Sequence, residues 1–399
     1  MTAVAQRVAQ LSEAQTLGMA QRVRELRAAG KPVLSLLLGE PDFPVPEPIR
    51  AAAIAAIQEG HAPYPPVPGI APLREAIASY YHRTYGIPCS VEWVVVSNGS
   101  KQAIFNALFS LIEPGEEVVI PAPYWVSYLP LVHLAQGQPV IAPTTQVEGY
   151  KLTPEKLARF LSPRTKALIL CSPSNPTGSC YSRAELEALA EVLSAYPQVW
   201  VISDEIYELI RYEGRHVSPA QVPSLTERTV ICNGFSKAFA MPGWRLGYAL
   251  APPKLAAAMA KVQGQISSGA NLIAQKAALA GLQSDLTQLL APMIQAFRER
   301  RDYIYAYLKA HLPQTEPYLP EGAFYFLLNV SSFLGKVTPT GEIIADADSL
   351  TEYLLAHGIA LVSGTAFGAP QHLRLSYAVA LSEIKAGLPR IVEALSALV

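Results

Sequence analysis

Largely apolar runs alternate along the chain with stretches of helical periodicity. The apolar runs read as buried strands and lie at 93–96, 117–120, 139–142, 166–171, 199–202, 229–232 and 246–250. Helical spacing follows at 102–112, where apolar residues recur every three or four positions, and a capping box opens a helix at 182–196. Near-continuous apolar strands separated by helices indicate a parallel sheet covered on both faces. The pattern therefore predicts an α/β fold.

The pattern changes after about residue 285. A charged helix at 298–310, a strand at 322–328, a helix at 350–357, a glycine-containing loop at 362–368, an alternating strand at 372–377 and a final amphipathic helix follow. At the other end, a helix within residues 1–30 ends at Gly30, and 33–38 is a short apolar strand. We therefore expect a segment, 1–35, packed with a small α+β domain, 286–399, and a large domain at 36–285.

Two segments are too rich in proline for helix or central strand. Residues 39–48 contain Gly39 and four prolines, and residues 63–69 contain Tyr64 among four prolines and Gly69. A proline-stiffened loop holds a side chain such as Tyr64 at low entropic cost, which suits a binding site or an interface. A structural loop explains the same composition equally well.

Composition excludes several classes of function. The 399 residues carry a formal net charge of −1 with the two signs interspersed, which argues against nucleic acid as a partner. The N-terminus lacks the apolar core of a signal peptide, and no apolar run reaches membrane-spanning length, so we expect a cytoplasmic protein without membrane contact. The four cysteines and seven histidines show neither metal-ligand spacing nor a hydrolase triad, so no metal is expected.

Polar residues gather just beyond the predicted strands. The segments 97–101, 172–178, 204–207 and 236–237 each follow the C-terminal end of a strand. Ligands of open α/β sheets bind in the crevice at that edge. The sequence therefore predicts that these segments form one site.

The segment 233–245 carries the most distinctive chemistry. Lys237 can form an imine with an aldehyde, and Ser236 and Arg245 can bind a phosphate. A second phosphate seat is the turn at 97–101, which lies at a helix N-terminus. The alternatives are a basic surface loop and an ordinary strand–helix turn. A dinucleotide fingerprint and a P-loop are both absent from the sequence.

Other side chains could contact a charged, aromatic ligand. A carboxylate at a buried strand end, Asp204, needs a cation opposite it, and a protonated pyridine nitrogen would serve. Tyr207 and Asn175 can donate to a phenolate oxygen. Trp125 or Tyr124 could lie flat on an aromatic ring, although core packing is the commoner fate of such residues. Arg374, between two leucines, suits a substrate carboxylate or an internal salt bridge.

Taken together, these motifs resemble the class I aminotransferases of fold type I, which depend on pyridoxal phosphate, and within them the bacterial aspartate/prephenate subgroup. The resemblance covers essentially the whole chain. It rests on the segments 39–43, Tyr64 to Gly69, 123–125, 174–178, 203–207, 236–239, 243–245 and 374–377. It implies a large domain with a central, mostly parallel seven-stranded sheet, a smaller α+β domain, and a homodimer with shared active sites.

The resemblance also implies a role for each residue. Lys237 would form the Schiff base and carry the proton, Asp204 would pair with the pyridine nitrogen, and Tyr207 and Asn175 would bind the ring oxygen. Trp125 would stack on the ring. The phosphate would be bound by Gly99, Ser100, Lys101, Ser236 and Arg245, with Tyr64 reaching over from the partner subunit. Arg374, Asn175 and Gly39 would bind the substrate α-carboxylate, beside Trp125.

The implied reaction is ping-pong transfer of an amino group between an L-amino acid and a 2-oxo acid, with aspartate or glutamate as donor. The stretch 263–271 carries no arginine to read a second carboxylate, and the resemblance to the bacterial subgroup implies that Lys101 and Thr16 take this role. Prephenate, alanine and aromatic substrates stay open, as does a determinant among Arg7, Arg22 and Arg24. A carbon–sulfur lyase is the alternative within the fold. An effector-binding module of a transcription regulator is disfavoured by the short leader and balanced charge.

Overall fold

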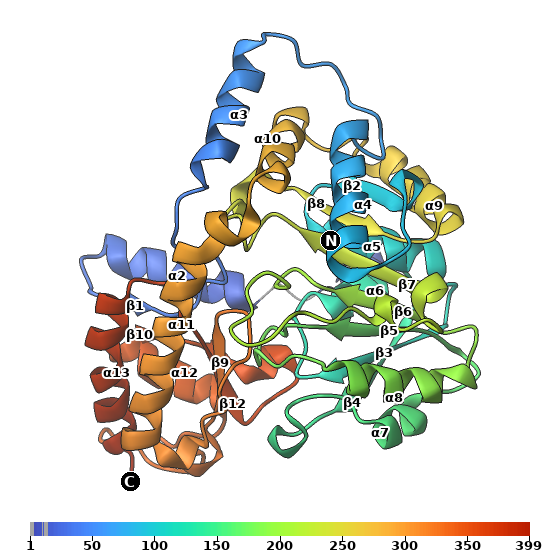
Figure 1. The fold of residues 1–399 in the computed structure, drawn as a ribbon. Coiled ribbons are helices and arrows are strands. Elements are labelled where there is room, and N and C mark those ends of the chain that lie inside the picture. Colours follow the sequence, from blue (N-terminus) through green and yellow to red (C-terminus); the bar gives the residue numbers. More distant parts are fainter. Residues whose placement is uncertain (1–3, 10, 12–14) are drawn as a thin grey trace.

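The computed structural model describes residues 4–9, 11 and 15–399, and Figure 1 shows their arrangement. A large part with a central sheet lies beside a smaller part formed by the C-terminal helices and strands together with the N-terminal helix α2 (Gln15–Ala28). Thr16 belongs to α2, but its side chain lies outside what the structure describes. The same is true of Arg7 in the short helix α1 (Gln6–Ala9).

The large sheet has seven strands in the order β2-β8-β7-β6-β5-β3-β4. They are β2 (Val94–Ser97), β3 (Glu117–Ala122), β4 (Gln138–Pro143), β5 (Thr165–Cys171), β6 (Trp200–Asp204), β7 (Thr229–Gly234) and β8 (Gly247–Leu250). Only β8 runs antiparallel to its neighbours. The predicted seven-stranded, mostly parallel sheet is therefore confirmed, and no strand end is shifted by more than two residues.

The core of this sheet has two faces because successive side chains of a strand point in opposite directions. Val118 and Ile120 of β3 pack in one apolar cluster, whereas Val119 between them packs in another. The same alternation separates Ile169 from Leu168 in β5. Burial on both faces is the reason that these strands read as continuous apolar runs.

Helices cover both faces of the sheet (Figure 1). They are α4 (Ala71–Tyr85), α5 (Ser100–Leu111), α6 (Tyr128–Leu134), α7 (Pro154–Phe160), α8 (Arg183–Ser194) and α9 (Pro253–Ile266). A further helix, α3 (Glu47–Gln58), packs against α10 (Leu272–Gln283) at the edge of the large part. The apolar spacing at 102–112 and the capping box at 182–196 predicted α5 and α8, whereas α4, α9 and α10 were not predicted.

The smaller part contains two short sheets. One has the order β11-β12-β9, formed antiparallel by β9 (Tyr325–Asn329), β11 (Val362–Ser363) and β12 (His372–Ser376). The other pairs β1 (Leu34–Ser35) in parallel with β10 (Ile359–Ala360), so that the N-terminal segment is hydrogen-bonded to the C-terminal part. The helices are α11 (Leu286–His311), α12 (Ala347–Ala356) and α13 (Leu381–Ser396).

Two elements outside the large sheet differ clearly in length from the expectation. Only Leu34–Ser35 of the predicted strand 33–38 is paired as a strand. Helix α11 begins at Leu286 rather than at 298, because Leu290, Met293 and Phe297 continue the buried stripe of its charged second half. The helical spacing of the apolar residues in that first half could have indicated the earlier start of the helix.

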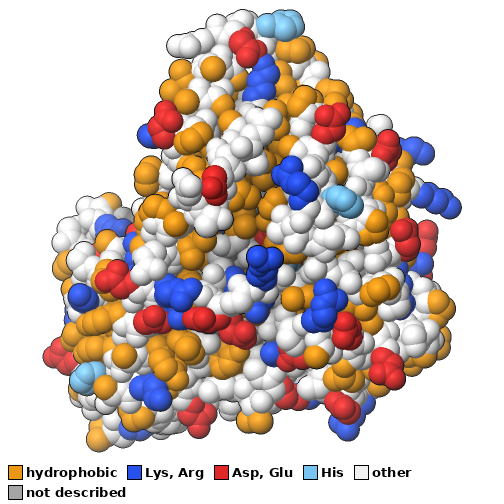
Figure 2. Space-filling model, in the orientation of Figure 1, with side chains coloured by type: hydrophobic (Ala, Val, Ile, Leu, Met, Phe, Trp, Pro, Cys, Tyr) orange, Lys and Arg blue, Asp and Glu red, His pale blue; other side chains and the backbone are white. Residues whose placement is uncertain are grey.

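Charged side chains of both signs are interspersed on the face shown in Figure 2. Among the described residues, no helix combines the length and the apolar character that a membrane crossing requires.

Candidate active site

A cavity of about 320 Å³ lies between the two parts, at the C-terminal ends of β5 and β6 and beside the loops that follow β2 and β7. Most of the residues predicted from the sequence line this cavity. They are Gly39, Ser100, Lys101, Trp125, Asn175, Asp204, Tyr207, Ser236, Lys237, Arg245 and Arg374. The edge of the sheet predicted from the polar segments is therefore the edge that carries the cavity.

Lys237 follows β7 and extends its amine into the cavity. Its Nζ donates a hydrogen bond to the carbonyl oxygen of Gly39 and lies 6.0 Å from the centre of the Tyr207 ring. Burial lowers the pKa of Lys237 to about 8, while Glu40 opposes this shift and Arg374 adds to it. A substantial fraction of the amine is therefore neutral near physiological pH, and a neutral amine is the form that attacks an aldehyde.

Asp204 ends β6 and is only 4% exposed. Its Oδ2 accepts a 2.7 Å hydrogen bond from the hydroxyl of Tyr128, and its Oδ1 accepts one from the backbone N–H of Ile206. Burial raises the pKa of Asp204 to about 6, and these two hydrogen bonds oppose the shift. A cation placed against this carboxylate would complete its ionisation.

The turn before α5 forms a concave seat lined with hydrogen-bond donors. Gly99 has φ 86°, and a Cβ at this position would lie 2.4 Å from Nη2 of Arg245. The Oγ of Ser100 is buried without a hydrogen-bond partner among the described residues. An unpartnered hydroxyl, a guanidinium and the free N–H groups of a helix N-terminus fit a phosphate. Gly99 supports this seat without lining the cavity.

Arg374 of β12 enters the cavity from the smaller part. Its Nη1 donates to Oδ1 of Asn175 over 3.1 Å, and its Nη2 donates to the carbonyl oxygen of Leu37 over 2.7 Å. The guanidinium lies between the rings of Tyr325 and Phe367, and its Nε has no hydrogen-bond partner in the described part of the chain. Burial lowers its pKa.

The competing prediction for Arg374 was an internal salt bridge. No carboxylate of the described residues lies within ion-pair distance of it. Its charge therefore faces the cavity uncompensated, as a binding site for an external carboxylate requires.

Lys101 provides another cation at the cavity. It lies on the first turn of α5, with Nζ 5.0 Å from the centre of the Trp125 ring. Burial, and then the nearby Arg245, lower its pKa.

Among the predicted residues whose side chains the structure describes, Tyr64 lies outside the cavity. Tyr64 does not line it and is 96% exposed, as a residue directed outward from this chain would be. Thr16 belongs to helix α2, and Ala20 of the same helix lines the cavity. The structure does not describe the side chain of Thr16.

Several residues that line the cavity or contact its lining were not predicted from the sequence. Tyr128 holds Asp204, the hydroxyl of Tyr325 lies 2.8 Å from that of Tyr207, and Glu40 and Cys171 line the wall. Cys171 ends an apolar strand directly before a polar segment, and this position in the sequence could have indicated that it lies at the site. The sequence held no comparable signal for Tyr128 or Tyr325, because only the tertiary fold brings them to Asp204 and Tyr207.

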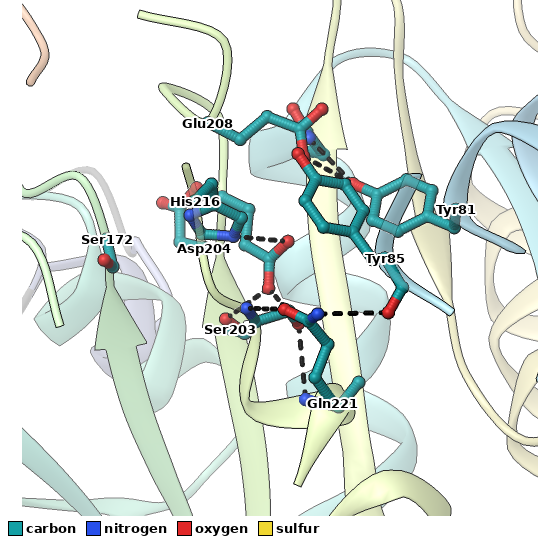
Figure 3. Close-up of polar contacts among 12 residues, drawn as sticks. Tyr81, Tyr85, Ser172, Ser203, Asp204, Glu208, His216 and Gln221 are labelled. Atoms are coloured by element: carbon teal, nitrogen blue, oxygen red, sulfur yellow. Dashed lines mark hydrogen bonds and ion pairs between the residues drawn. The ribbon is translucent and has the colours of Figure 1, made fainter. Parts of the chain in front are cut away.

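A second polar cluster is buried beside Asp204 (Figure 3). The Nε2 of His216 lies 3.1 Å from Oε2 of Glu205, whose Oε1 accepts hydrogen bonds from Ser203 and Ser218. Potential metal-ligand atoms of Glu205, Glu208 and His216 lie within 4.8 Å of one another, a grouping that the scattered histidines of the sequence did not reveal. Burial raises the pKa of Glu208 to about 7, so Glu208 can hold a proton that reduces the negative charge of the cluster.

The sequence matches the profile of the family "Aminotransferase class I and II" over residues 31–391. The chain belongs to this family. It is 44% identical to a bifunctional aspartate aminotransferase and glutamate/aspartate-prephenate aminotransferase of Petunia hybrida, over 98% of this chain and 82% of the relative. It is also 44% identical to an aspartate/prephenate aminotransferase of Cereibacter sphaeroides, over 96% of both chains.

Solved structures agree with this assignment. The aspartate aminotransferase from Rhizobium meliloti superposes with a TM-score of 0.95 at 39% identity and full coverage of both chains. The enzyme from Thermus thermophilus with maleate gives a TM-score of 0.93 at 38% identity, over 99% of this chain and 100% of that one. The predicted family and fold are confirmed, and the chain is a pyridoxal-phosphate-dependent aminotransferase.

The cavity fits this cofactor. It offers an amine for the aldehyde, a buried carboxylate for a ring cation, and the seat around Gly99 and Arg245 for the phosphate. The unpartnered Oγ of Ser100 supplies a further donor at that seat.

Proposed function

We propose that this aminotransferase takes the amino group from aspartate or glutamate and passes it to oxaloacetate or 2-oxoglutarate, with prephenate as a further acceptor. The observation that carries the proposal is that Arg374 and Lys101 enter one cavity from different parts of the fold. A dicarboxylate can therefore present each of its carboxylates to a separate cation. The names of the two relatives from Petunia hybrida and Cereibacter sphaeroides, which include aspartate, glutamate and prephenate, support the same substrates.

Each cofactor-binding role follows from the chemistry of a side chain in the cavity. Lys237 would bind the aldehyde carbon and later move a proton between that carbon and the substrate Cα. Asp204 would pair with the ring nitrogen, and Asn175 and Tyr207 would donate to the ring oxygen. When bound, the cofactor supplies an electron-accepting ring, and Trp125 would cover one of its faces.

The phosphate would be bound by the seat described above. It comprises the turn at Gly99, the hydroxyls of Ser100 and Ser236, and the guanidinium of Arg245, with Lys101 nearby. Fixing the phosphate would help to orient the aldehyde toward Lys237, because one rigid ring carries both groups.

Substrate binding would use the other end of the cavity. Arg374 and Asn175, with the backbone at Gly39, would bind the α-carboxylate, and Trp125 would border it. Lys101 and Thr16 would read the second carboxylate. The same residues would serve both half-reactions, because the amino donor and the 2-oxo acceptor carry the same α-carboxylate.

We further infer a homodimer in which Tyr64 contacts the partner's cofactor phosphate. Tyr64 is 96% exposed, and α3 beside it exposes Ile54 and Ile57 by 56% and 61%. Exposed apolar side chains on one helix suit a subunit interface. Mixing inactive Tyr64→Ala and Lys237→Ala subunits tests shared sites: hybrids regain activity if Tyr64 acts across the interface, and stay inactive if it does not.

The domain limits 1–35, 36–285 and 286–399 also stand as part of the proposal, supported by the pairing of β1 with β10 and by the separate sheets. A cytoplasmic location is proposed with them, and the four free cysteines suit a reducing compartment.

A half-reaction screen tests the substrate proposal. The holoenzyme is mixed with one amino acid at a time, and conversion of the bound cofactor to its amine form is followed by absorbance. Aspartate and glutamate should convert it at far lower concentrations than alanine or phenylalanine, and oxaloacetate and prephenate should each reverse the conversion. Equal response to all donors would refute dicarboxylate preference, and pyruvate release from cystathionine would indicate a lyase.

A further inference from the structure

We propose that Tyr128 is a positioning residue that orients Asp204 for contact with the cofactor ring. The inference rests on the proposed role of Asp204 and extends it to a residue with no assigned function. Tyr128 begins α6, whereas Asp204 ends β6, and the two are 76 residues apart in the sequence. Their contact is therefore a product of the tertiary fold.

The hydrogen bond between them has a single possible direction. The Tyr128 hydroxyl lies 2.7 Å from Oδ2 of Asp204, and both residues are almost fully buried. Burial raises the pKa of Tyr128 well above its ordinary value, with Asp204 adding to the shift, so the phenol keeps its proton and acts as donor. A charge-assisted bond of this kind is short and directional.

Tyr128 also compensates for a neighbouring charge. Burial raises the pKa of Asp204, and the carboxylate of Glu205, the next residue in the sequence, raises it further. The Tyr128 hydroxyl and the Ile206 N–H oppose both effects. Tyr128 thus favours the ionised carboxylate, which is the form that attracts a protonated ring nitrogen.

The same tyrosine contacts the aromatic side chain proposed to cover the ring. Its own ring packs edge-on against Trp125 at 5.5 Å between centroids, and its backbone N–H donates to the Trp125 carbonyl oxygen over 3.0 Å. One residue therefore fixes both the group proposed to face the ring nitrogen and the group proposed to face the ring surface. Replacing Tyr128 by phenylalanine removes the first contact and keeps the second.

Comparing the binding of two cofactors distinguishes the positioning role of Tyr128 from a general contribution to packing. Apoenzyme made from the purified holoenzyme is titrated with pyridoxal phosphate and with the analogue that carries carbon in place of the ring nitrogen. The wild type should bind pyridoxal phosphate more tightly than the analogue. Tyr128→Phe should weaken binding of pyridoxal phosphate about 10-fold and leave binding of the analogue unchanged.

The matched control is Tyr353→Phe, which removes a buried hydroxyl bonded to the Ala394 carbonyl in the smaller part. It should preserve the wild-type preference. Equal affinities of the wild type for both cofactors would refute the role of Asp204 itself. The role of Tyr128 would be overturned if Tyr128→Phe still preferred pyridoxal phosphate to the analogue as strongly as the wild type does. It would also be overturned if Tyr353→Phe lost this preference to the same extent as Tyr128→Phe.

A pH series gives a second readout. Affinity of the wild type for pyridoxal phosphate should fall as Asp204 takes up a proton below about pH 6, and in Tyr128→Phe the fall should begin at higher pH. 3-Fluorotyrosine at position 128 keeps the ring and donates more strongly, so it should move the fall to lower pH even if the phenylalanine variant does not fold. Unchanged midpoints would overturn the proposal.

Discussion

Nη1 of Arg374 donates to Oδ1 of Asn175 over 3.1 Å, and this bond joins β12 of the smaller part to the loop after β5 of the large sheet. The amide of Asn175 is thereby oriented with its oxygen toward the arginine, which leaves its nitrogen free to donate elsewhere. The two residues proposed to bind the α-carboxylate are thus positioned by each other before any ligand arrives. Such preorganisation lowers the entropic cost of binding.

Replacing Arg374 by lysine should raise KM for aspartate about 100-fold, because a point charge cannot reproduce the planar fork. Steady-state kinetics provides the measurement. Arg390→Lys is the control, since Arg390 of α13 donates to the backbone carbonyls of His357 and Gly358 and does not line the cavity. An unchanged KM in Arg374→Lys would contradict the assignment.

Lys101→Gln should lower kcat/KM for aspartate and glutamate about 10-fold and leave that for alanine nearly unchanged, because alanine has no second carboxylate. The comparison of donors is the informative measurement. A loss of the same size with all three donors would place Lys101 at the phosphate instead.

The lowered pKa of Lys237 predicts a pH dependence for cofactor uptake. Below pH 8 the amine of the apoenzyme is mostly protonated, and above pH 8 it is mostly neutral and nucleophilic. The rate of reconstitution with pyridoxal phosphate should therefore rise through about pH 8 and then level off. A rise that continues to pH 10 would show an ordinary lysine.

The raised pKa of Glu208 predicts a pH-dependent stability. The folded protein keeps this proton up to about pH 7, whereas an unfolded chain releases it near 4.5. The free energy of unfolding should therefore fall as pH rises between these values. Glu208→Gln mimics the protonated form and should be more stable than wild type at pH 8, by up to about 3 kcal/mol, with little difference at pH 5.

Denaturant unfolding at the two pH values measures this effect. The exposed Glu299→Gln serves as control and should change stability equally at both. A stabilisation by Glu208→Gln that is the same at pH 5 and pH 8 would contradict a proton on Glu208.

Much of this arrangement could be predicted from the sequence. The strands of the large sheet could be recognised as apolar runs because they are buried on both faces. The polar segments that follow them include Asp204, Asn175 and Lys237, which line the cavity. Tyr128 and Tyr325 could not be predicted, since each contacts a site residue from a different element and looks in the sequence like an ordinary core tyrosine. The cluster of Glu205, Glu208 and His216 could not be predicted for a similar reason, because His216 lies in a loop and only the fold brings it to Glu205.

The central claim is that Lys237 is the covalent anchor of the cofactor. A second lysine in the cavity, Lys101, also has a lowered pKa and could in principle form the same bond. The most direct measurement is reduction of the holoenzyme with borohydride, followed by peptide mass spectrometry to locate the pyridoxyl group. The group should be found on Lys237, and Lys237→Ala should carry none. A label on Lys101, or one that persists in Lys237→Ala, would contradict the account.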